Sequence, residues 1–207
     1  MNENHIILRA VMAGLFIGIA GLIFLSVENK TLGALLFSFG LLMVVSKGYF
    51  LYTGKVGYAL PYQKGYLNIL LKTLLGNIIG IGAVGLIFQL SGMTEVITSA
   101  EMIFISKLSK TWYEAFILAI FCGMMMYVGV NGYKKYDNPI LKVLIVIFAV
   151  VIFILAKFEH SIANLLYLFL GNHFTLASLL YVMIWIFGNA LGAILLNLVD
   201  ERLNQSI

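Results

Sequence analysis

Long apolar stretches alternate with short polar connections along the whole chain. A helix rises about 1.5 Å per residue, so it needs roughly 20 apolar residues to cross the hydrocarbon core of a bilayer. Stretches that reach this length predict six membrane-spanning helices near residues 6–27, 32–60, 66–91, 112–131, 140–170 and 175–199. The pattern therefore predicts an all-α integral membrane protein, with one membrane domain over residues 1–207.

Two of these stretches are interrupted by polar residues. Leu32 to Val45 is an apolar run of 14 residues that ends at Ser46-Lys47-Gly48, and Val143 to Ala156 is a run of the same length that ends at Lys157. Fourteen helical residues cover only about 21 Å, so we expect both crossings to break near the middle of the membrane. Freed backbone groups must then line a cavity or be covered by protein, and such paired breaks predict a transport site.

The breaks divide the chain into two similar halves, at about residues 6–91 and 112–199. The last span of each half contains the pattern GNxxG, at Gly76–Gly80 and at Gly188–Gly192. The first spans align with Arg9-Ala10, Phe16 and Gly18 opposite Glu114-Ala115, Phe121 and Gly123. Three spans per half is an odd number, which predicts a 3+3 inverted repeat. We expect the glycines to serve mainly as close-packing residues between helices.

The composition excludes a water-soluble protein. Apolar residues make up 62% of the chain and charged residues 11%, and the mean hydropathy is +1.02, far from the mixture typical of soluble domains. The net charge of +4 comes from scattered cations without a basic face, so we expect no nucleic-acid partner. Cys122 is the one cysteine and is expected to be buried. No metal-ligand cluster or cofactor motif is present in the sequence.

The cations between the spans predict the orientation in the membrane. Connections with Lys55, Lys64 and the group at 134, 135 and 142 carry more cations than those with Lys30, Lys107 and Lys110. Cation-rich connections favour the cytoplasm, so both termini are expected there, in a multi-pass protein of the cell (inner or plasma) membrane. The first run, Ile6 to Val27, is too long for a signal-peptide core and is expected to be retained.

The breaks contain the residues most suited to chemistry. Ionisable groups deep in a membrane usually face a cavity or a partner, which selects Lys47, Lys157, Glu159 and His160. If Ser161 caps a half-helix beginning at Ile162, the positive end of that helix lies beside His160 and favours an anion. A neutral histidine could exchange a proton with a weak-acid anion. Thr53 would offer a hydroxyl at the opposite half-helix.

Structural roles remain open for the same residues. His160 could be a buried structural hydrogen-bonder, and Glu159 could tie the broken backbone together. Lys47 and Lys157 could extend towards the membrane surface or pair with acidic groups.

The chain resembles the formate/nitrite transporter family from about residue 6 to residue 199. The resemblance rests on Phe158-Glu159-His160-Ser161-Ile162-Ala163-Asn164, on Leu51-Tyr52-Thr53-Gly54, on Met12–Gly18 and on the two GNxxG elements. It implies an aquaporin-like fold, a homopentamer and one pore per protomer. It also implies that the protein is a channel or a proton-coupled carrier for small monovalent anions such as formate, nitrite, hydrosulfide or short carboxylates.

Site residues follow from the resemblance position by position. It implies a central proton relay at His160, with Thr53 and Asn164 beside the pathway and a vestibule lysine at Lys107. It implies hydrophobic constrictions at Phe37, Leu41, Leu51 and Phe153. The chain departs from the family in having Gly123 where many members have asparagine, and in having cations at Lys47 and Lys157. These cations could tune the anion site, shift the substrate, or neutralise Glu159.

Two other classes of function are less consistent with the sequence. A membrane enzyme using Glu159 and His160 would need them on one face, but adjacent helical residues point about 100° apart and no nucleophile or metal cluster accompanies them. A neutral-solute channel of the aquaporin or urea type shares inverted half-helices, but the chain lacks the Asn-Pro-Ala signature. Its two prolines, Pro61 and Pro139, lie at span edges.

Overall fold

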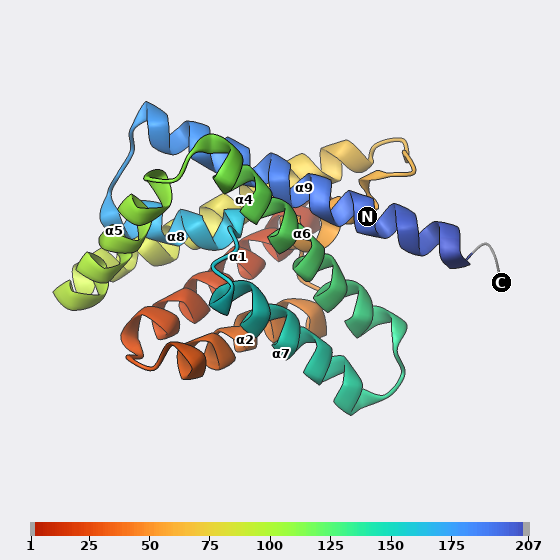
Figure 1. Ribbon diagram of the computed structural model, residues 1–207, viewed down its shortest axis with the longest axis horizontal. Helices are drawn as coiled ribbons and strands as arrows, with labels where there is room; N and C mark the ends of the chain where they lie inside the picture. Colours follow the sequence, from red (N-terminus) through yellow and green to blue (C-terminus); the bar gives the residue numbers. More distant parts are fainter. Residues whose placement is uncertain (1–2, 205–207) are drawn as a thin grey trace.

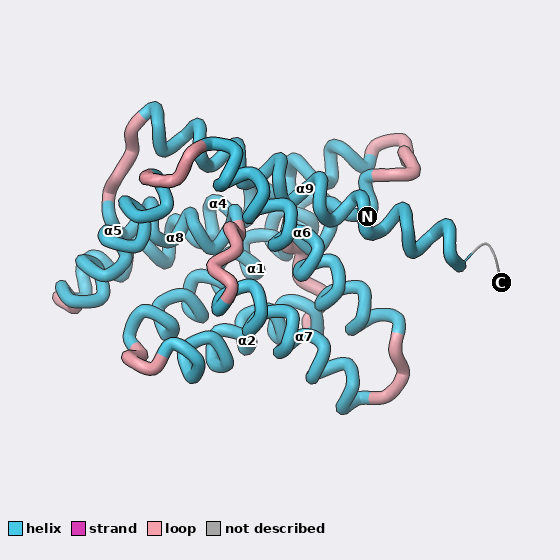
Figure 2. Tube along the Cα trace, viewed as in Figure 1, coloured by secondary structure: helices cyan, strands magenta, loops and turns pink. Residues whose placement is uncertain are grey.

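The computed structural model describes residues 3–204, and this part of the chain is built from helices and loops without strands (Figure 2). The terminal residues 1–2 and 205–207, which belong to the expected domain and to the expected cytoplasmic ends, lie outside the described residues. The helices are α1 (Glu3–Ser26), α2 (Lys30–Ser46), α3 (Tyr52–Lys55), η1 (Val56–Ala59), α4 (Tyr66–Phe88), η2 (Gln89–Ser91), α5 (Thr94–Leu108), α6 (Trp112–Lys135), α7 (Pro139–Leu155), α8 (Ser161–Gly171) and α9 (Leu176–Asn204).

Four of the six predicted spans coincide with long apolar helical segments. Four helical segments, at 5–26, 66–91, 112–135 and 176–204, are long and apolar enough to cross a membrane. The two interrupted stretches are divided as expected, because α2 ends at Ser46 and α7 ends at Leu155. The expectation of a plain connection around Lys107 is wrong, because that lysine lies in the last turn of α5.

Each half of the chain packs its helices in the same way (Figure 1). In the first half α1 packs against α2 and α4, and in the second half α6 packs against α7 and α9. The halves meet where α2 lies beside α7. The short segments cross over: α8 packs against α4 and α5, while η1 packs against α9. Each half therefore covers the broken segment of the other.

Glycines bring the long helices into backbone contact. A Cβ atom on Gly14 would lie 2.3 Å from the carbonyl oxygen of Asn77, and one on Gly123 would lie 2.1 Å from that of Asn189. The GNxxG glycines Gly80 and Gly192 approach α1 and α6 equally closely. Their expected role as close-packing residues is confirmed. An asparagine at position 123 would clash with the backbone of Asn189 in α9.

The two breaks share one set of backbone hydrogen bonds, displaced by 109 positions. The equivalent pairs are Tyr49 N to Val44 O (2.9 Å) and Phe158 N to Phe153 O (2.9 Å), and then Phe50 N to Arg9 O (3.2 Å) and Glu159 N to Leu118 O (3.3 Å). This register makes Gly14 the equivalent of Gly123. The alignment expected from sequence, which placed Gly18 opposite Gly123, is therefore wrong by one helical turn.

Candidate functional site

His160 occupies the end of the second break and caps the helix that follows. Its Nδ1 accepts a hydrogen bond from the backbone N–H of Ala163 at 3.1 Å, and α8 begins at Ser161. The expectation that Ser161 is the cap is wrong by one residue. The imidazole is nevertheless placed at the helix N-terminus, where exposed N–H groups and the helix dipole favour negative charge.

A matched pair of asparagines holds the two breaks in place. Asn189 donates to the carbonyls of Ala119 and Glu159, both at 2.8 Å, and accepts from Ser161 N–H at 2.8 Å. In the first break, Asn77 makes the equivalent bonds to Ala10 O (2.8 Å), Phe50 O (2.7 Å) and Tyr52 N (2.8 Å). Each buried amide therefore satisfies backbone groups that the broken helix leaves free.

Thr53 and His160 join the two halves at the centre of the molecule. The Thr53 hydroxyl lies 3.1 Å from His160 Nε2, and both residues are buried. Because Nδ1 accepts a bond from a backbone N–H, it is unprotonated, so a neutral ring carries its proton on Nε2. That N–H then donates to the Thr53 oxygen. The structure thus brings together two residues that the sequence analysis selected separately, and their role in transport stays a prediction.

Glu159 is buried within a group of cationic and amide side chains. Its Oε2 accepts from Lys107 at 2.6 Å and from Asn164 at 2.8 Å, and Lys110 Nζ lies 3.1 Å from Oε1. A buried carboxylate is costly unless it is paired and hydrogen-bonded. The expectation that the Glu159 side chain ties the broken backbone together is wrong, because that task belongs to Asn189.

Two cavities reach towards this centre from opposite breaks. The larger, of about 360 Å³, is called the Lys107 cavity, and its lining includes Phe37, Lys107, Phe153, His160 and Asn164. The smaller, of about 230 Å³, is called the Lys55 cavity, and its lining includes Leu51 and three cations, Arg9, Lys55 and Lys134. Both cavities thus carry positive charge, as an anion pathway requires.

Apolar side chains contribute to the lining of both cavities, with Phe37 and Phe153 in the Lys107 cavity and Leu51 in the Lys55 cavity. Phe37 and Phe153 meet edge to face with their ring centroids 6.0 Å apart, and the Phe153 ring lies 5.4 Å from the His160 ring. Leu41 and Leu51 are each only 1% exposed. An ionised solute would lose its hydration among these residues, whereas a neutral one would cross at lower cost.

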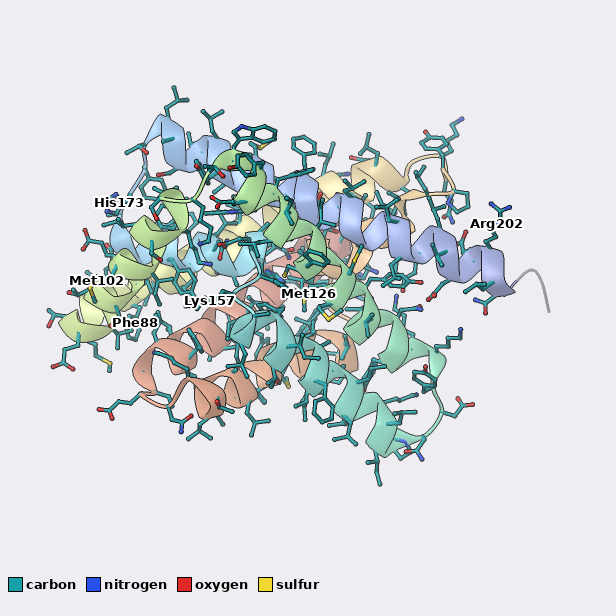
Figure 3. All side chains as sticks on the ribbon, in the orientation of Figure 1. Phe88, Met102, Met126, Lys157, His173 and Arg202 are labelled. Carbon is teal, nitrogen blue, oxygen red and sulfur yellow. The ribbon has the colours of Figure 1, made fainter. Side chains whose placement is uncertain are left out.

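The two unusual lysines of the breaks have different positions. Lys157 lines the Lys107 cavity, whereas Lys47 lines neither cavity. Figure 3 shows Lys157 at the break between α7 and α8. Its φ of 57° lies in the left-handed region, which costs a residue other than glycine roughly 1–2 kcal/mol. The idea that these lysines neutralise Glu159 is not supported, because Lys107 and Lys110 already do so.

A sequence profile described as "Formate/nitrite transporter" matches residues 1–200. The chain belongs to the formate/nitrite transporter family. Among curated proteins of this family, the formate channel FocA of Haemophilus influenzae is 29% identical over 161 residues, covering 69% of this chain and 54% of the relative. The formate channel FocB of Escherichia coli is 26% identical over 190 residues, covering 79% and 65%. The chain thus spans between about half and two thirds of the length of these relatives.

Two solved structures have the same fold as this chain. An "FNT family ion channel" superposes with a TM-score of 0.84 at 21% identity, covering 97% of this chain and 90% of that one. A structure titled "Pentameric formate channel with formate bound" superposes with a TM-score of 0.78 at 21% identity, covering 97% and 95%. Together with the apolar helices, family membership establishes a membrane protein and argues against an enzyme.

Sequence reasoning missed three residues of the site. Lys110 was seen only as a connection cation, although it completes the pairing of Glu159. Asn77 and Asn189 were noticed within GNxxG, but their role at the breaks was not foreseen. A signal was available, because an asparagine repeated inside two apolar spans needs polar partners nearby.

Proposed function

We propose that the chain is a transmembrane channel for small monovalent weak-acid anions, of which formate is the first candidate. The observation that carries this proposal is the buried Thr53–His160 pair: His160 lines the cation-rich Lys107 cavity, and Gly54, next to Thr53, lines the cation-rich Lys55 cavity. The names of the relatives, formate channels in two organisms, are consistent with it. Nitrite, hydrosulfide and short carboxylates share the chemistry of a small weak acid and remain further substrates.

The proposed mechanism moves the anion as its neutral acid. Lys107 attracts the anion into its cavity, and the N-terminus of α8 with the Thr53 hydroxyl holds it near the centre. A proton supplied by way of His160 removes the charge, so that the acid passes Phe37 and Phe153 and then Leu41 and Leu51. Asn164 keeps Glu159 oriented beside this pathway through its 2.8 Å hydrogen bond.

The proposed membrane topology has six crossings. The four long helices supply four of them, and the broken pairs α2 with α3–η1 and α7 with α8 supply the other two. The hydrogen bonds repeated at an interval of 109 residues support two related halves, and three crossings in each half require opposite orientations. The cation-rich ends, with Lys55 and Lys134, would face the cytoplasm of a cell-membrane protein together with both termini.

We further propose assembly as a homopentamer with one pathway in each protomer. Support comes from the fold shared with the structure titled as a pentameric formate channel. Many large apolar side chains on α4, α7 and α9 are exposed on the isolated chain, among them Leu86, Phe148 and Phe187. Such surfaces require lipid or neighbouring protomers.

A stopped-flow assay on purified protein in liposomes tests the proposal. Formate, nitrite, hydrosulfide, lactate and urea are supplied in parallel at two pH values. We expect rapid uptake of at least one weak-acid anion, with a rate that depends on pH. Flux of urea alone would favour the neutral-solute alternative, and an absence of flux would exclude the channel function.

A further inference from the structure

We propose that Lys157 captures the ionised substrate at the Lys107 cavity, and that the chain retains a strained backbone at this position for that purpose. The inference rests on the anion-channel function proposed above. It makes Lys157 a residue that sets the affinity for the anion at the Lys107 cavity. Three features support it: the backbone conformation of Lys157, the charge balance of the cavity, and the equivalent position in the first break.

The equivalent position in the first break is Gly48. Gly48 has a φ of 64° and Lys157 a φ of 57°, and they lie 109 positions apart within the same backbone hydrogen-bond pattern. Glycine adopts this left-handed conformation without a steric penalty, whereas lysine does not. A Cβ atom added to Gly48 would meet no atom within 4 Å. The turn therefore needs no side chain for packing, and glycine is the less strained solution.

The charge balance of the cavity indicates what the lysine provides. The Lys107 cavity is lined by four lysines, at positions 30, 107, 110 and 157, and by one carboxylate, that of Glu159. Lys107 and Lys110 pair with that carboxylate, while the exposed Lys157 side chain has no ion-pair partner within residues 3–204. Its ammonium group is therefore available to an entering anion. Strain that persists at such a position is typical of a functional site.

This arrangement makes a specific kinetic prediction. A charge at the entrance attracts the ionised form of the substrate, but it contributes little once the substrate is protonated and has left the cavity. Loss of the charge should raise the half-saturating anion concentration and leave the maximum rate unchanged. The effect should fade as salt screens the interaction.

Three variants separate charge from strain. Lys157→Gln removes the charge and keeps the unfavourable backbone, whereas Lys157→Gly removes both. Lys47→Gln is the matched control, because Lys47 is an exposed lysine at the other break, with an ordinary φ of −90°, and lines neither cavity. Formate influx into liposomes is measured at ionic strengths on the order of 10 mM and 1 M, and thermal unfolding is followed in detergent.

We expect both Lys157 variants to raise the half-saturating formate concentration about 3- to 5-fold at low salt. Their values should converge with that of the unmodified protein at high salt. Lys157→Gly should also raise the unfolding temperature by about 2–4 °C, because strain is removed. Lys157→Gln should leave that temperature unchanged, and Lys47→Gln should change neither quantity.

The opposite results overturn the inference. An unchanged half-saturating concentration in Lys157→Gln would show that the charge captures no substrate. A lower unfolding temperature in Lys157→Gly would show that the lysine serves the fold. Either result, obtained while the unmodified protein conducts formate, rejects only the role of Lys157; absence of anion flux in the unmodified protein would instead reject the function on which it rests.

Discussion

The two breaks have the same backbone but different chemistry. Position 51 in the first break corresponds to position 160 in the second, and each residue occupies the N-cap position of the short helix that follows. The first position is Leu51, which has no polar side chain, and the second is His160, which binds both Ala163 N–H and Thr53. One scaffold therefore provides an apolar barrier in one half and a candidate proton donor in the other.

The difference separates the scaffold from the chemistry. The backbone of each break depends on a buried asparagine in the last long helix of the same half, Asn77 or Asn189. Replacing Asn77 should destabilise the first break about as much as replacing Asn189 destabilises the second. Replacing Leu51 and replacing His160 should instead have different consequences for transport. The following variants test this division.

The largest effect is expected for His160→Asn. Asparagine is a good helix cap and keeps a hydrogen-bonding side chain, but it does not exchange protons. We expect pH-dependent formate uptake to fall on the order of 100-fold or more, as for loss of a general acid, leaving at most an ungated anion leak that is insensitive to pH. Formate flux in liposomes at two pH values measures this. A variant that behaves like the unmodified protein would exclude the relay.

The two buried asparagines, Asn77 and Asn189, should contribute equally to the free energy of unfolding. Asn77→Ala and Asn189→Ala each leave buried backbone groups without partners, at a cost of roughly 3 kcal/mol in the free energy of unfolding. Thermal unfolding in detergent should show similar losses in the two variants. Ser38→Ala is a suitable control, because within residues 3–204 that buried hydroxyl bonds only to the Ala34 carbonyl of its own helix. A loss of stability in only one of the two Asn→Ala variants would mean that the two breaks are not equivalent scaffolds.

Thr53→Val should have a smaller effect on flux. The substitution keeps the shape of the side chain and removes the hydroxyl that accepts from His160 Nε2. A hydrogen bond of this kind contributes about 1 kcal/mol, so we expect formate flux to fall about 5-fold. Ile162→Val, at the equivalent position of the second break, is the matched control and should leave flux nearly unchanged. Equal effects in the two variants would assign the loss to packing.

The smallest effect on formate is expected for Leu51→Ala. Truncation of this side chain widens the apolar barrier next to the Lys55 cavity but leaves His160 intact. Urea flux should rise about 2-fold or more, because less apolar surface obstructs a neutral polar solute, while the pH dependence of formate uptake stays the same. Leu70→Ala, in α4 and outside both cavities, loses a similar buried volume. An equal urea leak in both variants would argue against a constriction at Leu51.

The positions of the helices could be predicted from the sequence, because the lengths of apolar runs are set by membrane thickness. The division of the second and fifth spans followed from polar residues such as Lys47 and Glu159 inside apolar surroundings. α5 was missed because it is shorter and lies between two spans, where a connection was expected. Its last turn carries Lys107, so the sequence analysis also missed that a helix places this lysine at the cavity.

Other features could not be obtained from one sequence. The repeat register was misassigned because a shift of four residues keeps the same helix face, so apolar helices align almost equally well one turn apart. The pairing of Lys110 with Glu159 joins residues far apart in the chain, and only the fold brings them together. The cap at His160 required the backbone geometry, because serine is the commoner capping residue.

The crossed packing of the short segments has a consequence for biosynthesis. When the ribosome has completed α4, the surface that later receives α8 has no protein cover, and η1 has not yet met α9. In the first half, the surface of α4 that contacts α8 therefore stays uncovered in the bilayer until residues 161–171 have been synthesised. Final folding must follow translation of α8 and α9, and a chain truncated before α8 should be a substrate for membrane quality control.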